Sequence, residues 1–301
     1  MFKHIIIPLD GSRLAETVLP TAVQLARALG ASVTLVHVIE RNPPRQIHGE
    51  THLTLPAEAE NYLDDVRRRY FPPEITVDQH VHAVAIADVA QSIVDHAHEF
   101  GSDLVAMCTH GKSGLKQWLF GNLAQKVSAA RIPVLLVRPG PGGVAPLSNG
   151  GPLLVPLDGS ELREVALPIA ATLAKACSTC IKLLMVVPTP GTLSGVETSS
   201  RILLPATTKA MLDLVKEDAV HYVRGLAEKL QSDPAVHVSG HVIEGEVAQV
   251  IADASQSLGV DWIVMGTSAR AGMDAFWSGS VAPKVFSRIY RPLLLIPGVE
   301  E

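Results

Sequence analysis

Short aliphatic runs alternate with longer stretches of helical spacing along the whole chain. The first run contains Ile5-Ile6-Ile7, and from Leu14 to Leu29 apolar residues then recur at intervals of three and four. Such intervals place one side of an amphipathic helix against a core, and Gly30 is a typical helix stop. Aliphatic strands that alternate with helices predict a parallel sheet covered by helices on both faces.

The same pattern continues to the end of the chain and repeats in each half. In the first half, strands are expected at 3–10, 33–39, 76–83, 104–108 and 134–137, and helices at 14–29, 57–70, 88–100 and 122–130. In the second half, strands are expected at 153–158, 181–187, 236–242, 262–266 and 293–296, and helices at 162–176, 206–231, 247–258 and 281–289. The predicted fold class is therefore α/β, with two tandem Rossmann-like (flavodoxin-like) domains, each a five-stranded parallel sheet with helices on both faces.

The pentapeptide Pro-Leu-Asp-Gly-Ser occurs twice, at Pro8–Ser12 and at Pro156–Ser160, each time between a strand and a helix. A motif that returns at the same place of a repeated pattern indicates a duplication. We therefore predict a first domain at 1–138 and a second at 152–301, joined by a linker at 139–151 that is rich in Pro, Gly and Ser. Ligands of open parallel sheets bind at the carboxyl ends of the strands, where both copies lie.

The composition narrows the choice of partners. A net charge of −5 and the lack of a dense Lys/Arg cluster argue against nucleic acid. No apolar run approaches the ~18 residues of a membrane-spanning helix, and the first predicted strand begins close to Met1, which leaves no room for a signal peptide. Three cysteines are too few for a disulfide framework. We expect a cytoplasmic protein that binds neither nucleic acid nor membrane.

The fourth predicted strand of each half runs into a loop that contains glycines. The first loop reads from Cys108 through Gly111 to Gly121-Asn122, and the second from Gly266 through Ala269 to Gly279-Ser280. Glycine allows backbone N–H groups to approach a ligand closely, and the helix that follows starts with unpaired N–H groups and a positive dipole end. Each loop is therefore a candidate phosphate cradle.

As a set, these motifs resemble the universal stress protein family in its tandem two-domain form. The resemblance rests on Asp-Gly-Ser after the first strand, His37-Val38 at the end of the second, the Thr-His-Gly loop after the fourth and the final Pro-Val-Leu-Leu-Val strand. It implies a stress-response protein that binds ATP, ADP or AMP, with or without Mg²⁺, as a regulatory ligand. It also implies that the last strands, 134–137 and 293–296, pair to form an intramolecular pseudo-dimer, and it leaves a homodimer open.

The resemblance further implies which residues hold the nucleotide. Asp10 and Asp158 would contact its ribose and adenine end. Val38 and Val186 would hold the adenine, while the loop glycines and the following helix start would bind the ribose and phosphates. The full implied set is Pro8, Asp10, Val38, Gly111, Gly121, Asn122 and Leu123 in the first half, and Pro156, Asp158, Val186, Gly266, Ala269, Gly279, Ser280 and Val281 in the second.

Both halves depart from the glycine pattern of the family's ATP-binding members. The first half has Cys108 and Asn122 where that pattern has Gly and then Ser or Thr, and the second has Ala269 at the middle Gly. Two interpretations stay open. One is nucleotide binding in one or both domains, with the second favoured because it keeps Gly279-Ser280. The other is an interaction protein with degenerate sites that acts through partners. An enzyme, at most a weak ATPase, ranks last because no nucleophile with a nearby base can be identified.

Two short motifs are interpreted as structural. Gly111-Lys112-Ser113 lacks the upstream glycine of a P-loop, because Ala106 stands at that position. Cys177 and Cys180 form a CxxC pair at the end of a predicted helix, whereas a redox pair of this kind lies at a helix start. We therefore expect two partly buried free thiols.

The twelve histidines raise the question of a metal site. His80 and His82 would share one strand face, while His96 lies on the next helix. His48 and His52 lie in the polar stretch after the second strand, where a loop is expected. Because no histidine pair has a Cys or carboxylate partner at the spacing of a metal site, no metal is expected.

Overall fold

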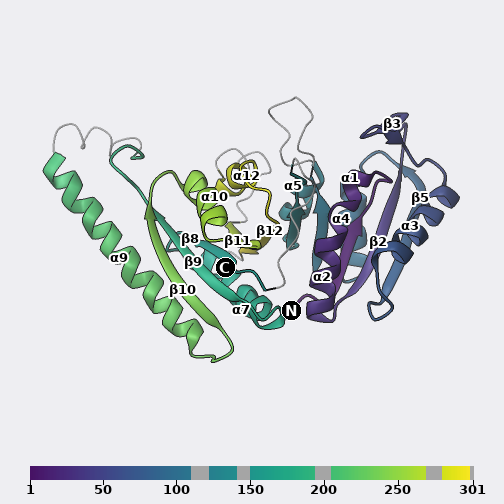
Figure 1. Cartoon of the computed structure of the whole chain (residues 1–301). Coiled ribbons are helices and arrows are strands. Elements are labelled where there is room, and N and C mark those ends of the chain that lie inside the picture. Colours follow the sequence, from purple (N-terminus) through teal and green to yellow (C-terminus); the bar gives the residue numbers. More distant parts are fainter. Residues whose placement is uncertain (110–121, 141–149, 194–204, 269–279, 299–301) are drawn as a thin grey trace. The chain divides into compact units, whose positions relative to one another are not determined.

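The structure is a computed structural model that describes residues 1–109, 122–140, 150–193, 205–268 and 280–298. Contacts between residues divide the chain into two compact units (Figure 1). The described part of unit 1 comprises 1–109, 122–140 and 290–298, and that of unit 2 comprises 150–193, 205–268 and 280–289. Unit 1 therefore includes the last strand of the chain.

Unit 1 is built on a mostly parallel sheet. Its main elements are β1 (His4–Pro8), α1 (Arg13–Glu16), α2 (Leu19–Leu29), β2 (Ser32–Glu40), α3 (Pro56–Tyr70), β5 (Val77–Ile86), α4 (Val89–Glu99), β6 (Leu104–Cys108), α5 (Asn122–Ala129), β7 (Val134–Val137) and β12 (Leu293–Gly298). The strands lie in the order β12-β7-β6-β1-β2-β5. Neighbours run parallel except β12, which is antiparallel to β7.

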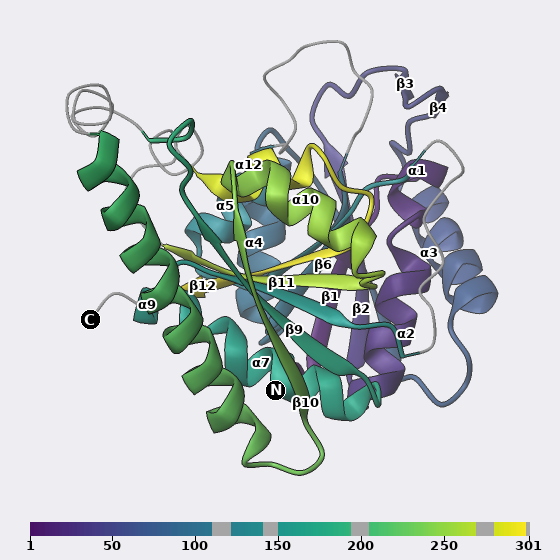
Figure 2. The ribbon, with the colours of Figure 1, turned by 60° about the vertical axis from the view of Figure 1, so that its left-hand side comes forward.

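The helices of unit 1 form two layers. Helix α2 packs against α3, and α4 packs against α5. Right-handed crossovers from β1 to β2 to β5 advance in one direction, whereas those from β5 to β6 to β7 return, so the two helix pairs cover opposite faces of the sheet (Figure 2). The strands are accordingly apolar on both sides, and Ile5, Ile6 and Ile7 have no exposed surface.

The edge of the unit 1 sheet is closed by the last strand of the chain. Leu293 pairs with Leu136 and Leu295 with Val134, and all four side chains are buried. This is the pairing that the sequence led us to expect for these two strands. The wider arrangement of two domains as a pseudo-dimer stays a prediction.

Unit 2 repeats the strand–helix order of the first half. Its elements are β8 (Leu153–Leu157), α6 (Glu161–Glu164), α7 (Ala166–Ala176), β9 (Cys180–Val187), α9 (Pro205–Gln231), β10 (His237–Glu244), α10 (Val247–Ser257), β11 (Trp262–Ser268) and α12 (Val281–Phe286). The strands lie in the order β10-β9-β8-β11, all parallel, and the long helix α9 packs on β10 and β9 (Figure 2). The predicted α/β fold with a mostly parallel sheet is thus confirmed.

The first helix of each half is broken, which corrects the sequence prediction of one continuous helix at 14–29 and at 162–176. Helix α1 ends at Glu16 and α2 begins at Leu19, with Pro20 in its first turn. The same break separates α6 from α7 before Pro168. Proline has no N–H to donate, and its ring collides with the carbonyl four residues earlier, so a continuous helix through Pro20 or Pro168 is disfavoured.

A second correction concerns the stretch after β2, where a loop was expected. It contains a small antiparallel hairpin, β3 (Gln46–Ile47) and β4 (Glu50–Thr51). Its turn is formed by His48 and Gly49, whose φ angles of 53° and 86° lie in the left-handed region. The hairpin and the residue after it place the side chains of His48, Glu50 and His52 beside the functional site described next.

No helix among the described residues combines the length and apolar character needed to cross a membrane.

Candidate functional site

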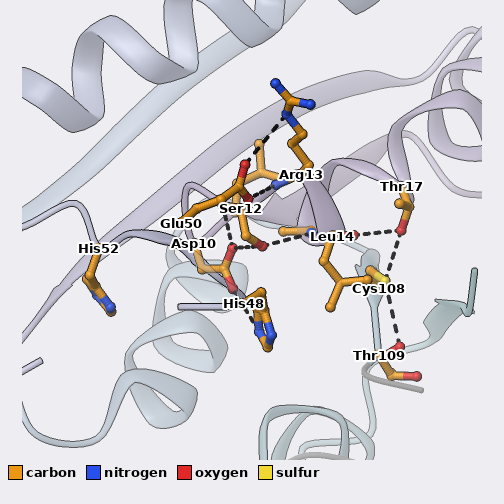
Figure 3. A network of polar contacts seen from close by, with 12 residues as sticks. Asp10, Ser12, Arg13, Leu14, Thr17, His48, Glu50, His52, Cys108 and Thr109 are labelled. Atoms are coloured by element: carbon orange, nitrogen blue, oxygen red, sulfur yellow. Dashed lines mark hydrogen bonds and ion pairs between the residues drawn. The ribbon is translucent and has the colours of Figure 1, made fainter. Parts of the chain in front are cut away.

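A cavity of about 250 Å³ lies at the carboxyl ends of β1, β2 and β6 in unit 1. We call it the first cavity. Its walls are mostly apolar, and helices α4 and α5 contribute Ile93 and Leu123. Polar groups enter from the strand ends and from the hairpin, including Asp10 and His48 (Figure 3).

The Asp-Gly-Ser motif forms a tight polar turn at the rim of this cavity. The backbone N–H and the hydroxyl of Ser12 both donate to Asp10 Oδ1, at 2.9 and 2.6 Å. Gly11 has a φ of +89°, which glycine adopts without strain. Ser12 Oγ in turn accepts from the N–H of Ala15 at 3.1 Å and caps α1. Serine therefore has the capping role, and Asp10 orients that serine while its other oxygen, Oδ2, stays at the cavity rim.

The β3–β4 hairpin and the residue that follows it add polar side chains around Asp10 (Figure 3). His48 Nε2 lies 3.8 Å from Asp10 Oδ2. Glu50 accepts from the backbone N–H of Arg13 at 2.6 Å, and its other oxygen lies 3.6 Å from the Arg13 Nε. His52 is buried, with Nε2 3.8 Å from Glu40. These residues were not among those predicted for the site, and their one signal in the sequence is their position shortly after β2.

Cys108 ends β6 at the place where the family's ATP-binding pattern has a glycine. Its thiol lies 2.9 Å from the hydroxyl of Thr17, which donates to it, and it lines the first cavity. Burial raises the pKa of the Cys108 thiol to about 11, although the hydrogen bond from Thr17 opposes the shift. A thiol with this pKa is protonated at neutral pH, so Cys108 is a small polarisable wall residue and not a nucleophile.

His37 lies at the floor of the first cavity and is 2% exposed. Its Nδ1 makes a 2.7 Å hydrogen bond with the carbonyl of Leu9 and thereby ties β2 to the end of β1. Burial lowers the pKa of His37, while the hydrogen bond to Leu9 opposes the shift. The ring is therefore neutral at pH 7, and it donates from Nδ1 because the carbonyl can only accept.

The helix that follows the Asp-Gly-Ser motif of the first half ends in a buried carboxylate, that of Glu16. Glu16 is 7% exposed and accepts from both terminal nitrogens of Arg69, at 3.1 and 3.2 Å, and from the hydroxyl of Tyr70 at 3.1 Å. In unit 2, Glu164 accepts from the hydroxyl of Tyr222 at 2.8 Å. These contacts fix α1 and α6 to the neighbouring long helices, so the motif that follows each first strand is held in place.

Unit 2 has a smaller cavity at the matching place, with a volume of about 100 Å³. We call it the second cavity. It is lined by the ends of β8, β9 and β11 and by the start of α12. Asp158 Oδ1 accepts from the N–H of Ser160 at 3.1 Å, and Gly159 has a φ of +83°, so the turn of the first half is reproduced.

Arg163 distinguishes the second cavity from the first. Its Nε lies 3.1 Å from Asp158 Oδ2, and its Nη1 donates to the carbonyl of Gly266 at 3.3 Å. A Cβ on Gly266 would lie only 2.5 Å from the Arg163 carbonyl oxygen, so this glycine is explained by the close packing of α6 on β11. The corresponding position in the first half is Ala15, while Arg13 of α1 lies against Glu50, so the described part of unit 1 has no counterpart of the Arg163–Asp158 ion pair.

The structure brings most of the implied site residues together. Pro8, Asp10, Val38 and Leu123 line the first cavity. Pro156, Asp158, Val186, Gly266, Ser280 and Val281 line the second. Asn122 is the first residue of α5, and Gly111, Gly121, Ala269 and Gly279 lie outside the described residues.

The CxxC prediction is confirmed. Cys177 is the C-cap of α7 and Cys180 begins β9, and both are free and partly buried. Burial raises the pKa of Cys177. This is the opposite of the shift that a reactive thiol needs.

Comparison with known proteins gives a consistent result for both halves. The model of the universal stress protein family matches residues 1–138 and 151–297. Universal stress protein YxiE of Bacillus subtilis (strain 168) is 28% identical over 152 residues, which are 46% of this chain and 100% of that protein. Universal stress protein MJ0531 of Methanocaldococcus jannaschii is 30% identical over 145 residues, 46% of this chain and 83% of that protein.

A solved structure matches the chain over its full length. A universal stress protein from Archaeoglobus fulgidus DSM 4304 has a TM-score of 0.70 with 16% identity, and the match covers 99% of this chain and 97% of that one. At this identity the likeness concerns the fold alone. It extends the match beyond single-domain relatives to a chain of comparable length.

Proposed function

The chain belongs to the universal stress protein family, and from this premise we propose that unit 1 binds an adenine nucleotide as a regulatory ligand of a stress response. The observation that supports this best is the first cavity. Its volume of about 250 Å³ approaches the ~300–1,000 Å³ that small-molecule sites occupy. The second cavity, at about 100 Å³, falls well short. The structure therefore favours the first half, where the sequence favoured the second.

The chemistry of the first cavity suits the three parts of a nucleotide. Val38, Ile93 and Leu123 offer apolar surface for a purine. Asp10 has a carboxylate oxygen at the rim that can accept from ribose hydroxyls. The first turn of α5 begins at Asn122 and has backbone N–H groups without helical partners, which suit a phosphate. Mg²⁺ would bind together with the phosphates, so the test below is done both with and without it.

Unit 2 supports a second candidate role. Arg163 is paired with Asp158 and bonded to Gly266, so the carboxylate that would meet a ribose is already engaged. This favours a domain that acts through partners while unit 1 senses the nucleotide. On this view the chain takes up one nucleotide, not two.

Calorimetric titration of nucleotide-free protein with ATP, ADP and AMP, each with and without Mg²⁺, tests the proposal. We expect one equivalent per chain for at least one nucleotide. Absence of heat for all three at millimolar concentration would refute nucleotide binding, and two equal equivalents would refute the separate role of unit 2. Phosphate release is measured in parallel, and we expect it to stay at background because the proposed role of the nucleotide is regulatory.

A further inference from the structure

Three histidines that are separated in sequence meet on one face of the unit 1 sheet. His80 and His82 lie two residues apart on β5, and His96 lies on α4, where it is buried. One ring nitrogen of each residue lies within 4.8 Å of the other two. No metal was expected here from the sequence, because the spacing of neighbouring histidines does not show the approach of α4 to β5, which is a tertiary feature.

The geometry of the cluster matches that of metal ligands. His82 Nδ1 lies 3.0 Å from His96 Nε2. Two nitrogens that share a tetrahedral zinc ion at ~2.0–2.1 Å each are separated by about 3.3 Å. A small rotation of either ring therefore turns the observed contact into a shared ligand pair.

Glu99 supplies the outer contact that metal-bound histidines usually have. Its Oε2 lies 2.9 Å from His96 Nδ1. Because a carboxylate only accepts, the Nδ1 of His96 carries the proton and its Nε2 lone pair is directed toward His82. A histidine held by a carboxylate in this way has a fixed tautomer and a more basic ligand nitrogen.

His80 contributes an unsatisfied nitrogen. Its Nε2 is buried and has no hydrogen-bond partner among the described residues. The ring is held edge-on to His96 and Phe100, with centroid distances of 4.4 and 5.1 Å. A buried ring nitrogen without a partner is costly, and coordination would remove that cost.

From these observations we propose that His80, His82 and His96 form a binding site for one divalent transition-metal ion, with Zn²⁺ as the best-matched probe. Three imidazole ligands and an outer carboxylate are typical of zinc sites that leave a fourth position to water or another ligand. Imidazole also suits Cu²⁺ and Ni²⁺, whereas Mg²⁺ and Ca²⁺ prefer oxygen. None of the three histidines is among the described residues that line the first cavity, so the site is independent of the nucleotide proposal.

The duplicated second half provides an internal comparison. On β2 and β5, Val36 pairs with His80 and Val38 with His82. On β9 and β10, the corresponding pairs are Leu184 with His241 and Val186 with Ile243. The position on α10 that corresponds to His96 is Ala254. Unit 2 thus keeps one histidine of the three, which cannot hold a metal alone.

The test is a calorimetric titration of metal-free, full-length protein with Zn²⁺, and a titration with Co²⁺, whose visible absorption reports tetrahedral coordination. We expect one equivalent of Zn²⁺ per chain. His82→Ala and His96→Ala should each weaken binding by at least ~10–100-fold, and Glu99→Gln by about 10-fold. His98→Ala, on the same helix, and His241→Ala should bind like the wild type.

Two results would overturn the site. One is the absence of a stoichiometric Zn²⁺ equivalent in the wild type. The other is unchanged affinity in both His82→Ala and Glu99→Gln, which alter partly exposed side chains and avoid the buried His96. Circular dichroism of each variant shows whether it is folded. With either result the three histidines are a hydrogen-bonded packing cluster without metal.

Discussion

Arg163 lines the second cavity and forms an ion pair with Asp158, with the guanidinium Nε 3.1 Å from the carboxylate Oδ2. In the first half the position of Arg163 is taken by Ala15, and the position of Gly266 by Cys108. The duplicated motif is therefore intact in both halves, while its immediate surroundings differ. The two copies differ most in whether a cation from the following helix neutralises the motif's carboxylate.

Removal of Arg163 should release Asp158. A ligand that needs this carboxylate must first displace the guanidinium, and a partly exposed ion pair of this kind contributes up to ~1 kcal/mol. Arg163→Ala should therefore strengthen nucleotide binding in unit 2 by about two- to five-fold, or make it detectable. The matched control is Arg224→Ala, on the exposed surface of α9. Weaker binding in Arg163→Ala would instead mean that Arg163 contacts the ligand.

Asp10→Asn is the most direct test of the first cavity. The amide oxygen can still accept from Ser12, so the turn is kept, while the negative charge is lost. Because a hydrogen bond to a charged group contributes ~1.5–3 kcal/mol, the nucleotide Kd should rise by at least about ten-fold. Asp95→Asn, an exposed side chain bonded to Gln91, should leave the calorimetric titration unchanged. An unaltered Kd in Asp10→Asn would remove Asp10 from the site.

Gly266→Ala should destabilise unit 2. The added Cβ would lie 2.5 Å from the carbonyl oxygen and 2.8 Å from the Cα of Arg163, and backbone atoms cannot move aside easily. We expect a loss of about 1–3 kcal/mol in the free energy of unfolding. The control is Gly225→Ala in α9, where nothing lies within 4 Å, and a gain of about 0.5–1 kcal/mol is expected. Guanidinium unfolding measures both, and equal effects would contradict the packing argument.

Stability should fall as the pH is lowered below neutrality. Burial lowers the pKa of His37 in the folded chain, whereas the unfolded chain titrates near the ordinary value of about 6.5. The unfolded state therefore takes up the proton first. Stability is fully present above pH ~6.5 and declines as the pH falls from there toward the lowered folded pKa. The pKa values of His80 and His241 are also lowered, first by burial, and act in the same direction.

Thermal unfolding between pH 8 and pH 5 measures this effect. His37→Asn should flatten the dependence, because the titrating ring is gone. His221→Asn, whose side chain is 66% exposed, should keep the wild-type dependence. An identical pH dependence in wild type and His37→Asn would show that His37 does not cause the loss.

Cys108 should react slowly with alkylating reagents. Because its pKa is about 11, and an ordinary thiol titrates near 8.5, its thiolate fraction at pH 8 is roughly two orders of magnitude below that of a free cysteine. Iodoacetamide labelling at pH 8, followed by peptide mass spectrometry, should show this difference between native and urea-unfolded protein. Equal labelling rates in the two states would contradict the assigned burial.

The sequence predicted the parts of the fold that depend on local pattern. Aliphatic runs located the strands, and the repeated pentapeptide located both cavities through Asp10 and Asp158. The helix breaks at Pro20 and Pro168 were missed because apolar spacing continued across them, although each proline was a visible signal. The β3–β4 hairpin was missed since strands of two residues show no alternation.

Features that depend on tertiary contact could not be predicted in this way. Arg163 reaches the carbonyl of Gly266 because α6 packs against β11, and the sequence does not mark that long-range contact. His80, His82 and His96 come together because α4 folds back toward β5, although His96 lies fourteen positions after His82 in the sequence. Either contact could be predicted only after the order and register of the strands are known.

The pairing of β12 with β7 has a consequence for biosynthesis. Val134–Val137 is synthesised long before its partner, Leu293–Gly298, because the described elements of unit 2 lie between them in the sequence. During that interval the nascent first half has an open, apolar strand edge, which is a site for aggregation or for pairing with another chain. A fragment that ends at residue 138 should therefore self-associate, so a single half of this protein is a poor substitute for the whole in binding studies.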